Sequence, residues 1–267
     1  MTLKAESFPG KEHWKNNASK KLDLIMKNYF YTILLFVIGF VFSHAQNHQV
    51  KVSGAMKNVM QEGKLYGTIF LDTIPNKANL YGLGPKEYLK GELLVINGKS
   101  YLSSVNPDGS IKMEETFQVK APFFVYSNVA EWEEVALPEE VKTMKDLESF
   151  IDHYRKNFDD PFTFKLKGIF DTVDFHIQNL PEGTLVKSRH DAHKGQGKYV
   201  ENNAQGEIIG YFSTKHQQIF THHDSYIHIH FIADNKTKMG HIDRLVLGNK
   251  NKLFLPKELV DYIRNNQ

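Results

Sequence analysis

Cysteine is absent from the 267-residue sequence. This absence excludes a disulfide framework, a cysteine-ligated zinc ribbon, a cysteine nucleophile and a lipid-modified cysteine. Any metal site must therefore be built from histidine and carboxylate side chains. A sequence without thiols suits an oxidising compartment but does not require one.

Long hydrophobic runs are also scarce, and a single one stands out. It covers residues 29–42, YFYTILLFVIGFVF, which is short for a hydrocarbon core of about 30 Å. Lys27 precedes the run and Ser43-His44-Ala45, a small-x-small cleavage site, follows it. This layout is typical of a secretory signal. The sequence therefore predicts a signal peptide at 26–45 and an exported protein, periplasmic or extracellular. An uncleaved membrane anchor is the alternative.

The segment before this leader, residues 1–25, is polar and shows no useful periodicity. We interpret it as an upstream extension ahead of a start at Met26, outside the folded domain.

A strong net charge is lacking as well. Residues 1–45 carry six Lys/Arg and three Asp/Glu, so residues 46–267 hold 27 basic and 28 acidic side chains. A formal charge near −1 does not predict binding to nucleic acid or to an anionic membrane. With 41% hydrophobic and 24% charged residues, the composition is that of a globular protein. We therefore expect no nucleic-acid partner and, once the leader is removed, no membrane partner.

Strand patterns dominate residues 46–267. Asn97-Gly98 between the segments 92–96 and 99–102 is typical of a two-residue hairpin turn. A helix is predicted from Leu137, and a strand from Phe162 to Ile177 with a break at Gly168. Further strands are expected at 65–71, 123–126, 208–212, 226–233, 242–247 and 253–255, and short helices at 54–61 and 256–264.

These patterns predict an α+β fold of mixed or antiparallel sheets with few helices and a β-barrel-like C-terminal half. We expect an N-terminal sheet part at about 46–160 and a metal-binding C-terminal part at about 161–267.

Eight of the thirteen histidines fall between positions 190 and 241. On a strand, His228 and His230 project from one face while the apolar residues that alternate with them enter the core. Two neutral imidazoles on a rigid strand form a two-point grip for a metal. A hairpin would return His241 beside them, which gives three nitrogens and an open fourth position, as in catalytic zinc sites.

The bare His-x-His pattern is equally typical of a solvated strand face, because strands alternate polar and apolar residues in any case. The neighbouring histidines His190, His193, His222 and His223 are expected in solvated loops.

The segment 228–242, HIHFIADNKTKMGHI, resembles the acetolactate decarboxylase pattern HxHF(I/V)S(D/E)D…GGH, including the eleven-residue spacing. Residues 81–99 are similar to the family's GLGTF…LDGE(L/M)…LDGK. Residues 121–124 are similar to its TPF strand, and 206–211 to its G-T-(I/L)-V-G-F. The motifs are collinear over nearly all of 46–267, which implies an acetolactate decarboxylase-like fold.

The resemblance implies that His228, His230 and His241 are zinc ligands and that Glu92 is the active-site carboxylate. The implied activity is a carboxy-lyase, the zinc-dependent decarboxylation of 2-acetolactate to acetoin in the acetoin/butanediol pathway. The partner would be a small-molecule hydroxy-keto acid, and the assembly to expect, if any, is a homodimer. Zinc would act as a Lewis acid and Glu92 would deliver or relay a proton. No organic cofactor is needed.

Three positions depart from the family pattern. His176, our second catalytic candidate, stands where the family has a substrate-contacting arginine, whose fork and permanent charge an imidazole cannot reproduce. Pro85 replaces a threonine, and the sequence reaches Gln267 without the family's longer tail, which brings a further glutamate. Lys187 or Arg189 is a candidate for the missing cation. The alternative is therefore a zinc-binding family member that binds a ligand without turnover, or that acts on another hydroxy-keto acid.

Overall fold

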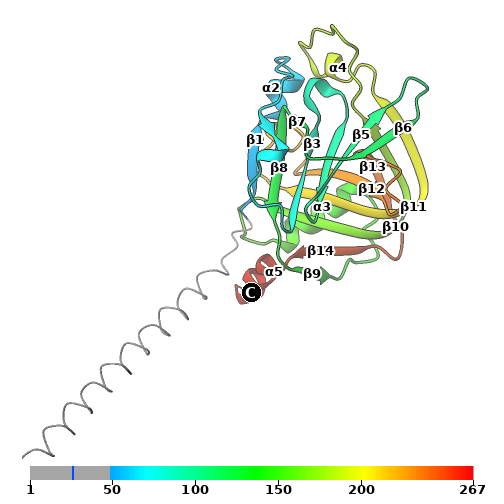
Figure 1. Cartoon of the computed structure of the whole chain (residues 1–267). Coiled ribbons are helices and arrows are strands. Elements are labelled where there is room, and N and C mark those ends of the chain that lie inside the picture. Colours follow the sequence, from blue (N-terminus) through cyan, green and yellow to red (C-terminus); the bar gives the residue numbers. More distant parts are fainter. Residues whose placement is uncertain (1–25, 27–48, 267) are drawn as a thin grey trace, which may run out of the picture. The chain divides into compact units, whose positions relative to one another are not determined.

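The computed structural model describes Met26 and residues 49–266 (Figure 1). The chain divides into two units, Met1–Gln46 and Asn47–Gln267, and all the named strands belong to the second unit. The predicted upstream extension, and the predicted signal peptide apart from Met26, lie outside the described residues. Within the described part, no helix has the length and apolar character needed to cross a membrane.

The first sheet has six strands in the order β1-β8-β3-β4-β5-β6. They are β1 (Lys51–Gly54), β3 (Leu80–Pro85), β4 (Glu92–Ile96), β5 (Lys99–Val105), β6 (Ile111–Glu115) and β8 (Phe123–Asn128). The short strands β2 (Ile69–Phe70) and β7 (Lys120–Ala121) pair separately. The predicted hairpin turn between β4 and β5 is confirmed, because Asn97 and Gly98 have φ values of 47° and 76°, as a type I′ turn requires.

The second sheet has the order β11-β12-β13-β10-β14-β9. Its strands are β9 (Trp132–Val135), β10 (Phe162–Ile177), β11 (Gly197–Phe212), β12 (Ile227–Ala233), β13 (Met239–Leu247) and β14 (Lys252–Pro256). All pairings between the named strands are antiparallel. An additional pairing between β10 and β11 joins the four strands β10, β11, β12 and β13 into a ring. The predicted β-barrel-like C-terminal half is confirmed in this loose sense. The predicted fold class is confirmed.

Few helices accompany the two sheets. They are α2 (Met56–Met60), α3 (Met144–Tyr154), α4 (Arg189–Ala192) and α5 (Lys257–Asn265), with 3₁₀ turns η1 (Leu71–Thr73) and η2 (Glu87–Leu89). In Figure 1, α4 lies at the top of this unit and α5 at the bottom, so these two helices mark opposite ends of it.

Three sequence predictions need correction at this level. The helix expected from Leu137 begins at Met144, because Thr143 and the Asp146 carboxylate form a capping box that fixes the first turn there. The strand expected at 65–71 is confined to β2, because the chain turns into η1. Gly168 does not interrupt β10, which stays paired with β11 through it. The pairing with β13 has two register shifts, one after Phe170 and one after Asp174.

Both faces of the second sheet contribute residues to the core, although some positions, such as Val200 of β11, are exposed. One face packs against α3 and α5 through a large apolar cluster that includes Phe164, Leu147 and Val260. Residues of the other face, such as Ile209 and Tyr211, join residues of the first sheet in a second cluster. The two sheets therefore share a core, and polar side chains that point between them are removed from water.

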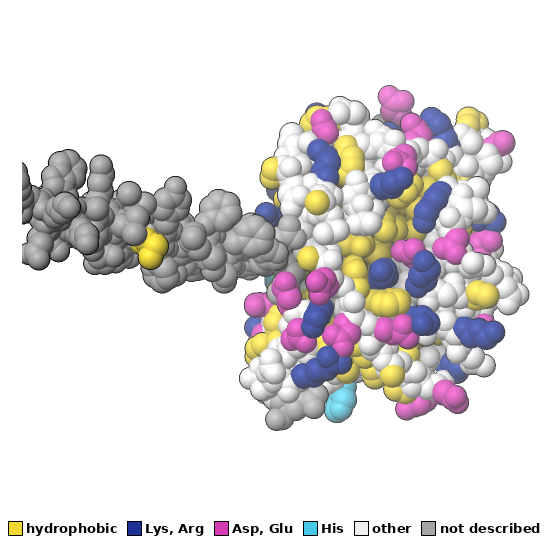
Figure 2. All heavy atoms as spheres, turned by 60° about the horizontal axis from the view of Figure 1, so that its bottom comes forward, with side chains coloured by type: hydrophobic (Ala, Val, Ile, Leu, Met, Phe, Trp, Pro, Cys, Tyr) yellow, Lys and Arg dark blue, Asp and Glu magenta, His cyan; other side chains and the backbone are white. Residues whose placement is uncertain are grey.

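The outer surface carries charges of both signs. Figure 2 shows one face on which Lys/Arg and Asp/Glu side chains are interspersed around a band of hydrophobic side chains. No large field of a single sign forms on this face, in keeping with the near-neutral charge of the folded unit.

Candidate metal centre

Two histidine side chains of strand β12 project from the same face of the sheet. Ile227, Ile229 and Phe231 are buried in the core cluster beneath α3. The residues between them, His228 and His230, project from the opposite face and are only 2% and 0% exposed. The alternation of the sequence thus places both imidazoles in the interior.

Strand β13 brings the third histidine to this pair. His241 lies directly opposite His230 in the β12–β13 register. The preceding Gly240 permits the close approach, because a Cβ there would lie 2.5 Å from the carbonyl oxygen of His176 on β10. A side chain at this position would push β13 away from β10 and displace His241.

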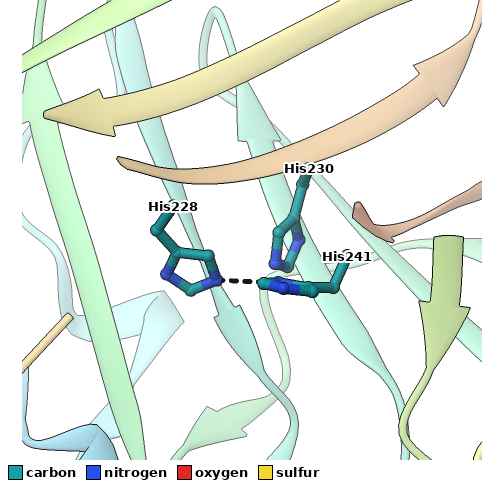
Figure 3. A group of neighbouring side chains, drawn as sticks. All are labelled: His228, His230 and His241. Atoms are coloured by element: carbon teal, nitrogen blue, oxygen red, sulfur yellow. Dashed lines mark hydrogen bonds between the residues drawn. The ribbon is translucent and has the colours of Figure 1, made fainter. Parts of the chain in front are cut away.

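The three imidazoles point toward one another (Figure 3). Nε2 of His228 lies 3.0 Å from Nδ1 of His241, and one ligand atom from each of His228, His230 and His241 lies within 4.8 Å of the others. Ligand nitrogens about 2.0–2.1 Å from a tetrahedral zinc are about 3.3 Å apart. The triad is therefore close to the spacing of three ligands around one ion.

Half of the six ring nitrogens of the triad make no well-formed hydrogen bond within the described residues, so they are available to a metal. Among the described residues, no well-formed hydrogen bond reaches Nδ1 of His228 or either ring nitrogen of His230, although the backbone of Phe220 and Leu93 lies near these two rings. Buried nitrogens that are poorly satisfied in this way are costly unless something else satisfies them. Burial lowers the pKa of His230 to about 3. Burial, with smaller contributions from neighbouring rings, also lowers the pKa of His228 and His241. Neutral imidazoles with free lone pairs are the form that binds a metal.

The same burial makes the metal-free protein sensitive to acid. An unfolded histidine titrates near pH 6.5, so below that value the unfolded chain binds more protons than the folded chain. The contribution of these histidines to the free energy of unfolding is therefore fully present above about pH 6.5. It falls by about 1.4 kcal/mol per pH unit for each histidine as the pH drops toward the pKa values of the folded state. Burial raises the pKa of Glu92, which has the opposite effect, but three histidines outweigh one carboxyl.

We therefore expect the urea midpoint of metal-free protein to fall when the pH is lowered from 7 to 5. Replacing His230 by Ala should make this fall smaller, since one of the titrating groups is gone. His153→Ala, at an exposed position of α3, should leave it unchanged. A midpoint that is constant or rises between pH 7 and 5 would contradict the prediction.

Glu92, the predicted active-site carboxylate, reaches the triad from the first sheet. It begins β4 and lies opposite Pro85 of β3 and Ser103 of β5. Its Oε2 is 3.7 Å from Nε2 of His230, and its Oε1 accepts a hydrogen bond of 3.3 Å from the Gln178 N–H. Burial raises its pKa well above the ordinary value, against the opposing effect of that N–H. The carboxyl group therefore tends to hold a proton.

His176, the second catalytic candidate, is the penultimate residue of β10 and lies opposite His241. The two rings are 4.8 Å apart. Nδ1 of His176 lies 2.8 Å from a carboxylate oxygen of Asp243, and its Nε2 lies 3.5 Å from the amide nitrogen of Gln178. His176 thus stands beside the triad, and any positive charge on its ring would be matched by Asp243.

The structure also places a histidine that the sequence prediction missed. His222 was expected in a solvated loop, but it is partly buried and its Nε2 lies 3.1 Å from Nε2 of His241. Since Nδ1 of His241 faces His228, His222 contacts the nitrogen that points away from the triad. A partner on the second ring nitrogen fixes the orientation of a metal-ligating imidazole. No local sequence pattern around His222 predicts this contact, because the contact depends on the path of the loop that carries His222.

We expect His222→Ala to weaken metal binding by about 10- to 100-fold without abolishing it, because the variant loses only the outer partner of His241. Competition with a chromogenic chelator measures this shift. His223→Ala is the matched control, since the neighbouring ring is exposed and does not contact the triad. An unchanged metal affinity in His222→Ala would show that His241 needs no such partner.

A cavity of about 630 Å³ adjoins these side chains. His228, His241, Glu92 and His176 all line it, so metal, proton donor and ligand could meet there. Its wall further includes Pro85, Gln178, Arg189, His193, Lys198 and Asp243. Arg189, unlike Lys187, belongs to this wall, and His193 also reaches it although His190 does not. A second cavity of about 410 Å³ shares His222, His228 and His241.

Comparison with known proteins gives a consistent family. A family model described as alpha-acetolactate decarboxylase matches residues 52–255. The alpha-acetolactate decarboxylase of Lactococcus lactis subsp. cremoris is 26% identical over 196 residues, which cover 71% of this chain and 77% of the relative. That of Brevibacillus brevis is 25% identical over 200 residues, covering 74% and 67%.

Solved structures show the same fold. An alpha-acetolactate decarboxylase from Bacillus subtilis strain 168 matches with a TM-score of 0.63 at 22% identity, over 78% of this chain and 84% of that one. A Staphylococcus aureus protein of unknown function, described as similar to alpha-acetolactate decarboxylase, matches with a TM-score of 0.61 at 16% identity, over 82% and 99%. At these identities the likeness concerns the fold alone.

Proposed function

The chain belongs to the alpha-acetolactate decarboxylase family, and on that premise we propose that it is a carboxy-lyase that converts 2-acetolactate to acetoin and carbon dioxide. The observation that carries the proposal is a cluster of three buried imidazoles, two of which line one cavity together with a buried carboxyl group. Curated relatives named for this activity match over most of the chain. In a cell, the product would serve the acetoin/butanediol pathway.

We propose that His228, His230 and His241 hold a zinc ion. An all-imidazole set of three with room for a further ligand suits zinc, and the absence of cysteine leaves nitrogen and oxygen as the donors available. When bound, zinc supplies a Lewis acid that stabilises the negative charge developing on the substrate as carbon dioxide leaves. The protein keeps the three rings neutral and oriented for this purpose.

Glu92 is positioned to donate the proton that the reaction consumes. Decarboxylation of a β-keto acid replaces a carbon–carboxylate bond by a carbon–hydrogen bond, so one proton must reach the carbon that loses the carboxylate. The raised pKa of the buried Glu92 favours the protonated form that can donate. Its Oε2 lies 3.7 Å from Nε2 of His230, its Oε1 accepts a hydrogen bond from the Gln178 N–H, and the residue lines the cavity.

The direct experiment is turnover of racemic 2-acetolactate by the folded unit, followed by acetoin formation. We expect activity in the metal-loaded protein, loss after a chelator removes the metal, and recovery when zinc is returned. Recovery with another divalent ion but not with zinc would overturn the choice of metal. Absence of turnover with one zinc bound per chain would favour the alternative, a family member that binds a ligand without turnover or acts on another hydroxy-keto acid.

A further inference from the structure

The substrate of the proposed reaction carries a carboxylate, and the cavity must provide a cation for it. Most charged residues of the cavity wall already have a partner of opposite charge. Asp243 accepts a hydrogen bond from His176 when Nδ1 carries the proton, and Asp174 pairs with Arg244 at 2.8 Å. The ring of His176 therefore offers no uncompensated charge to a ligand.

The guanidinium of Arg189 differs from these paired charged groups of the cavity wall. Arg189 begins α4, in the segment between β10 and β11, and its half-buried side chain lines the cavity that His228, His241 and Glu92 also line. Within residues 49–266, no carboxylate oxygen lies within the 4.0 Å of an ion pair with its guanidinium. A permanently charged group on the wall of a small cavity is thus left with no anionic partner.

Two neighbours hold the guanidinium in place. Nη1 of Arg189 lies 2.5 Å from Nδ1 of His223, and Nη2 lies 3.5 Å from the amide oxygen of Gln218. Both neighbours belong to the connection between β11 and β12, the loop that also carries His222. These contacts orient Arg189 while using only part of its five N–H donors.

We propose that Arg189 binds the carboxylate of the substrate and orients it against the metal centre. This inference rests on the proposed function. It places the carboxylate-binding cation on α4 and not at the β10 position that His176 occupies. Guanidinium matches a carboxylate with two parallel hydrogen bonds and keeps its charge at every physiological pH. Lys198, the other lysine or arginine on this wall, is exposed on β11 and offers a point charge on a flexible stem.

The chemistry of the step predicts which kinetic constant responds. As the bond to carbon dioxide breaks, negative charge leaves the carboxylate and moves toward the ketone. Arg189 therefore stabilises the bound substrate more than the transition state, and its loss should act mainly on binding. Arg189→Ala should raise KM for acetolactate about 10- to 100-fold, the range for a lost charged hydrogen bond, with a smaller change in kcat.

The matched control is Lys187→Ala. It removes the same charge two residues away, from an exposed side chain that does not line the cavity, and should leave KM within about twofold. Arg189→Lys keeps the charge without the fork and should give an intermediate KM. His223→Ala removes a neighbour of Arg189 but keeps its charge, so it separates loss of the cation from loss of the loop contact.

A binding measurement makes the test independent of turnover. Lactate is an unreactive 2-hydroxy carboxylate, whereas acetoin keeps the hydroxyl and ketone but lacks the carboxylate. With metal-loaded protein in a calorimeter, Arg189→Ala should weaken lactate binding at least about tenfold and leave acetoin binding within about twofold. Metal content is measured in the same samples and should not change.

The outcomes separate this inference from the proposed function. Turnover by the parent with unchanged KM and lactate affinity in Arg189→Ala overturns the role of Arg189 and leaves the decarboxylase. No turnover by the parent, but Arg189-dependent lactate binding, overturns the decarboxylase and keeps the anion site. A KM increase in Lys198→Ala but not in Arg189→Ala would assign the carboxylate to Lys198. An equal loss of lactate affinity in His223→Ala and Arg189→Ala would mean that Arg189 only holds the loop. Either result overturns the proposal.

Discussion

Replacing His230 by Ala is expected to lower the metal content of the purified protein to less than about a tenth of the one ion per chain proposed for the parent, and to abolish measurable decarboxylation. His230 is 0% exposed, and its Nε2 lies 3.7 Å from Oε2 of Glu92. Two imidazoles cannot complete a structural or catalytic zinc site, which needs at least three protein ligands. Elemental analysis after dialysis, together with acetoin formation, measures both effects.

The folded state should survive this substitution, which makes the result interpretable. In the absence of metal, neither buried ring nitrogen of His230 makes a well-formed hydrogen bond in the described part of the chain, so the imidazole itself costs free energy there. The loss of packing in His230→Ala is offset by the removal of this cost. We therefore expect a urea midpoint near that of metal-free parent at pH 7.

The exposed His153 again provides the matched control. His153→Ala should keep the metal and the activity of the parent. Retention of zinc by His230→Ala would show that the ligand set is wrong, even if the activity were lost. Retention of another metal in the parent would leave the three ligands in place and change the identity of the ion.

The parts of the site that follow from local sequence rules were predictable. Strand alternation is enough to put His228 and His230 on one face, because the period of a strand is two residues. A hairpin of suitable length then returns His241 to the register opposite His230, as the structure has it. The Asn97-Gly98 turn that follows β4, the strand that Glu92 begins, is equally local.

The remaining contacts depend on how distant segments meet. Asp243 faces His176 across 67 positions of the sequence, and Gln178 meets Glu92 across 86. His222 and Arg189 lie on connections between strands, where neither alternation nor helical spacing gives a direction to a side chain. Their roles become visible only when β10 to β13 close into a ring and bring these connections to the same cavity.

The second large effect is expected for Glu92→Gln, which should lower kcat by about 10²- to 10⁴-fold, the usual contribution of a positioned proton donor. The amide has nearly the same shape and keeps an oxygen that can accept the Gln178 N–H, but it cannot transfer a proton. Because Glu92 is not one of the three imidazole ligands, the variant should retain its metal. KM should change only a few-fold, since the carboxyl acts on the proton and not on binding.

The pH profile distinguishes proton transfer from a structural role. Burial raises the pKa of Glu92, and the protonated form donates, so activity of the parent should fall as the pH rises through that pKa. Glu92→Gln should lose this descending limb together with most of its rate. Glu87→Gln is the matched control, because Oε2 of Glu87 also accepts a single 3.3 Å hydrogen bond, from the Gly67 N–H, outside the cavity. If Glu92→Gln retained parental kcat with metal bound, the proton would have to come from elsewhere, and solvent water would be the simplest donor.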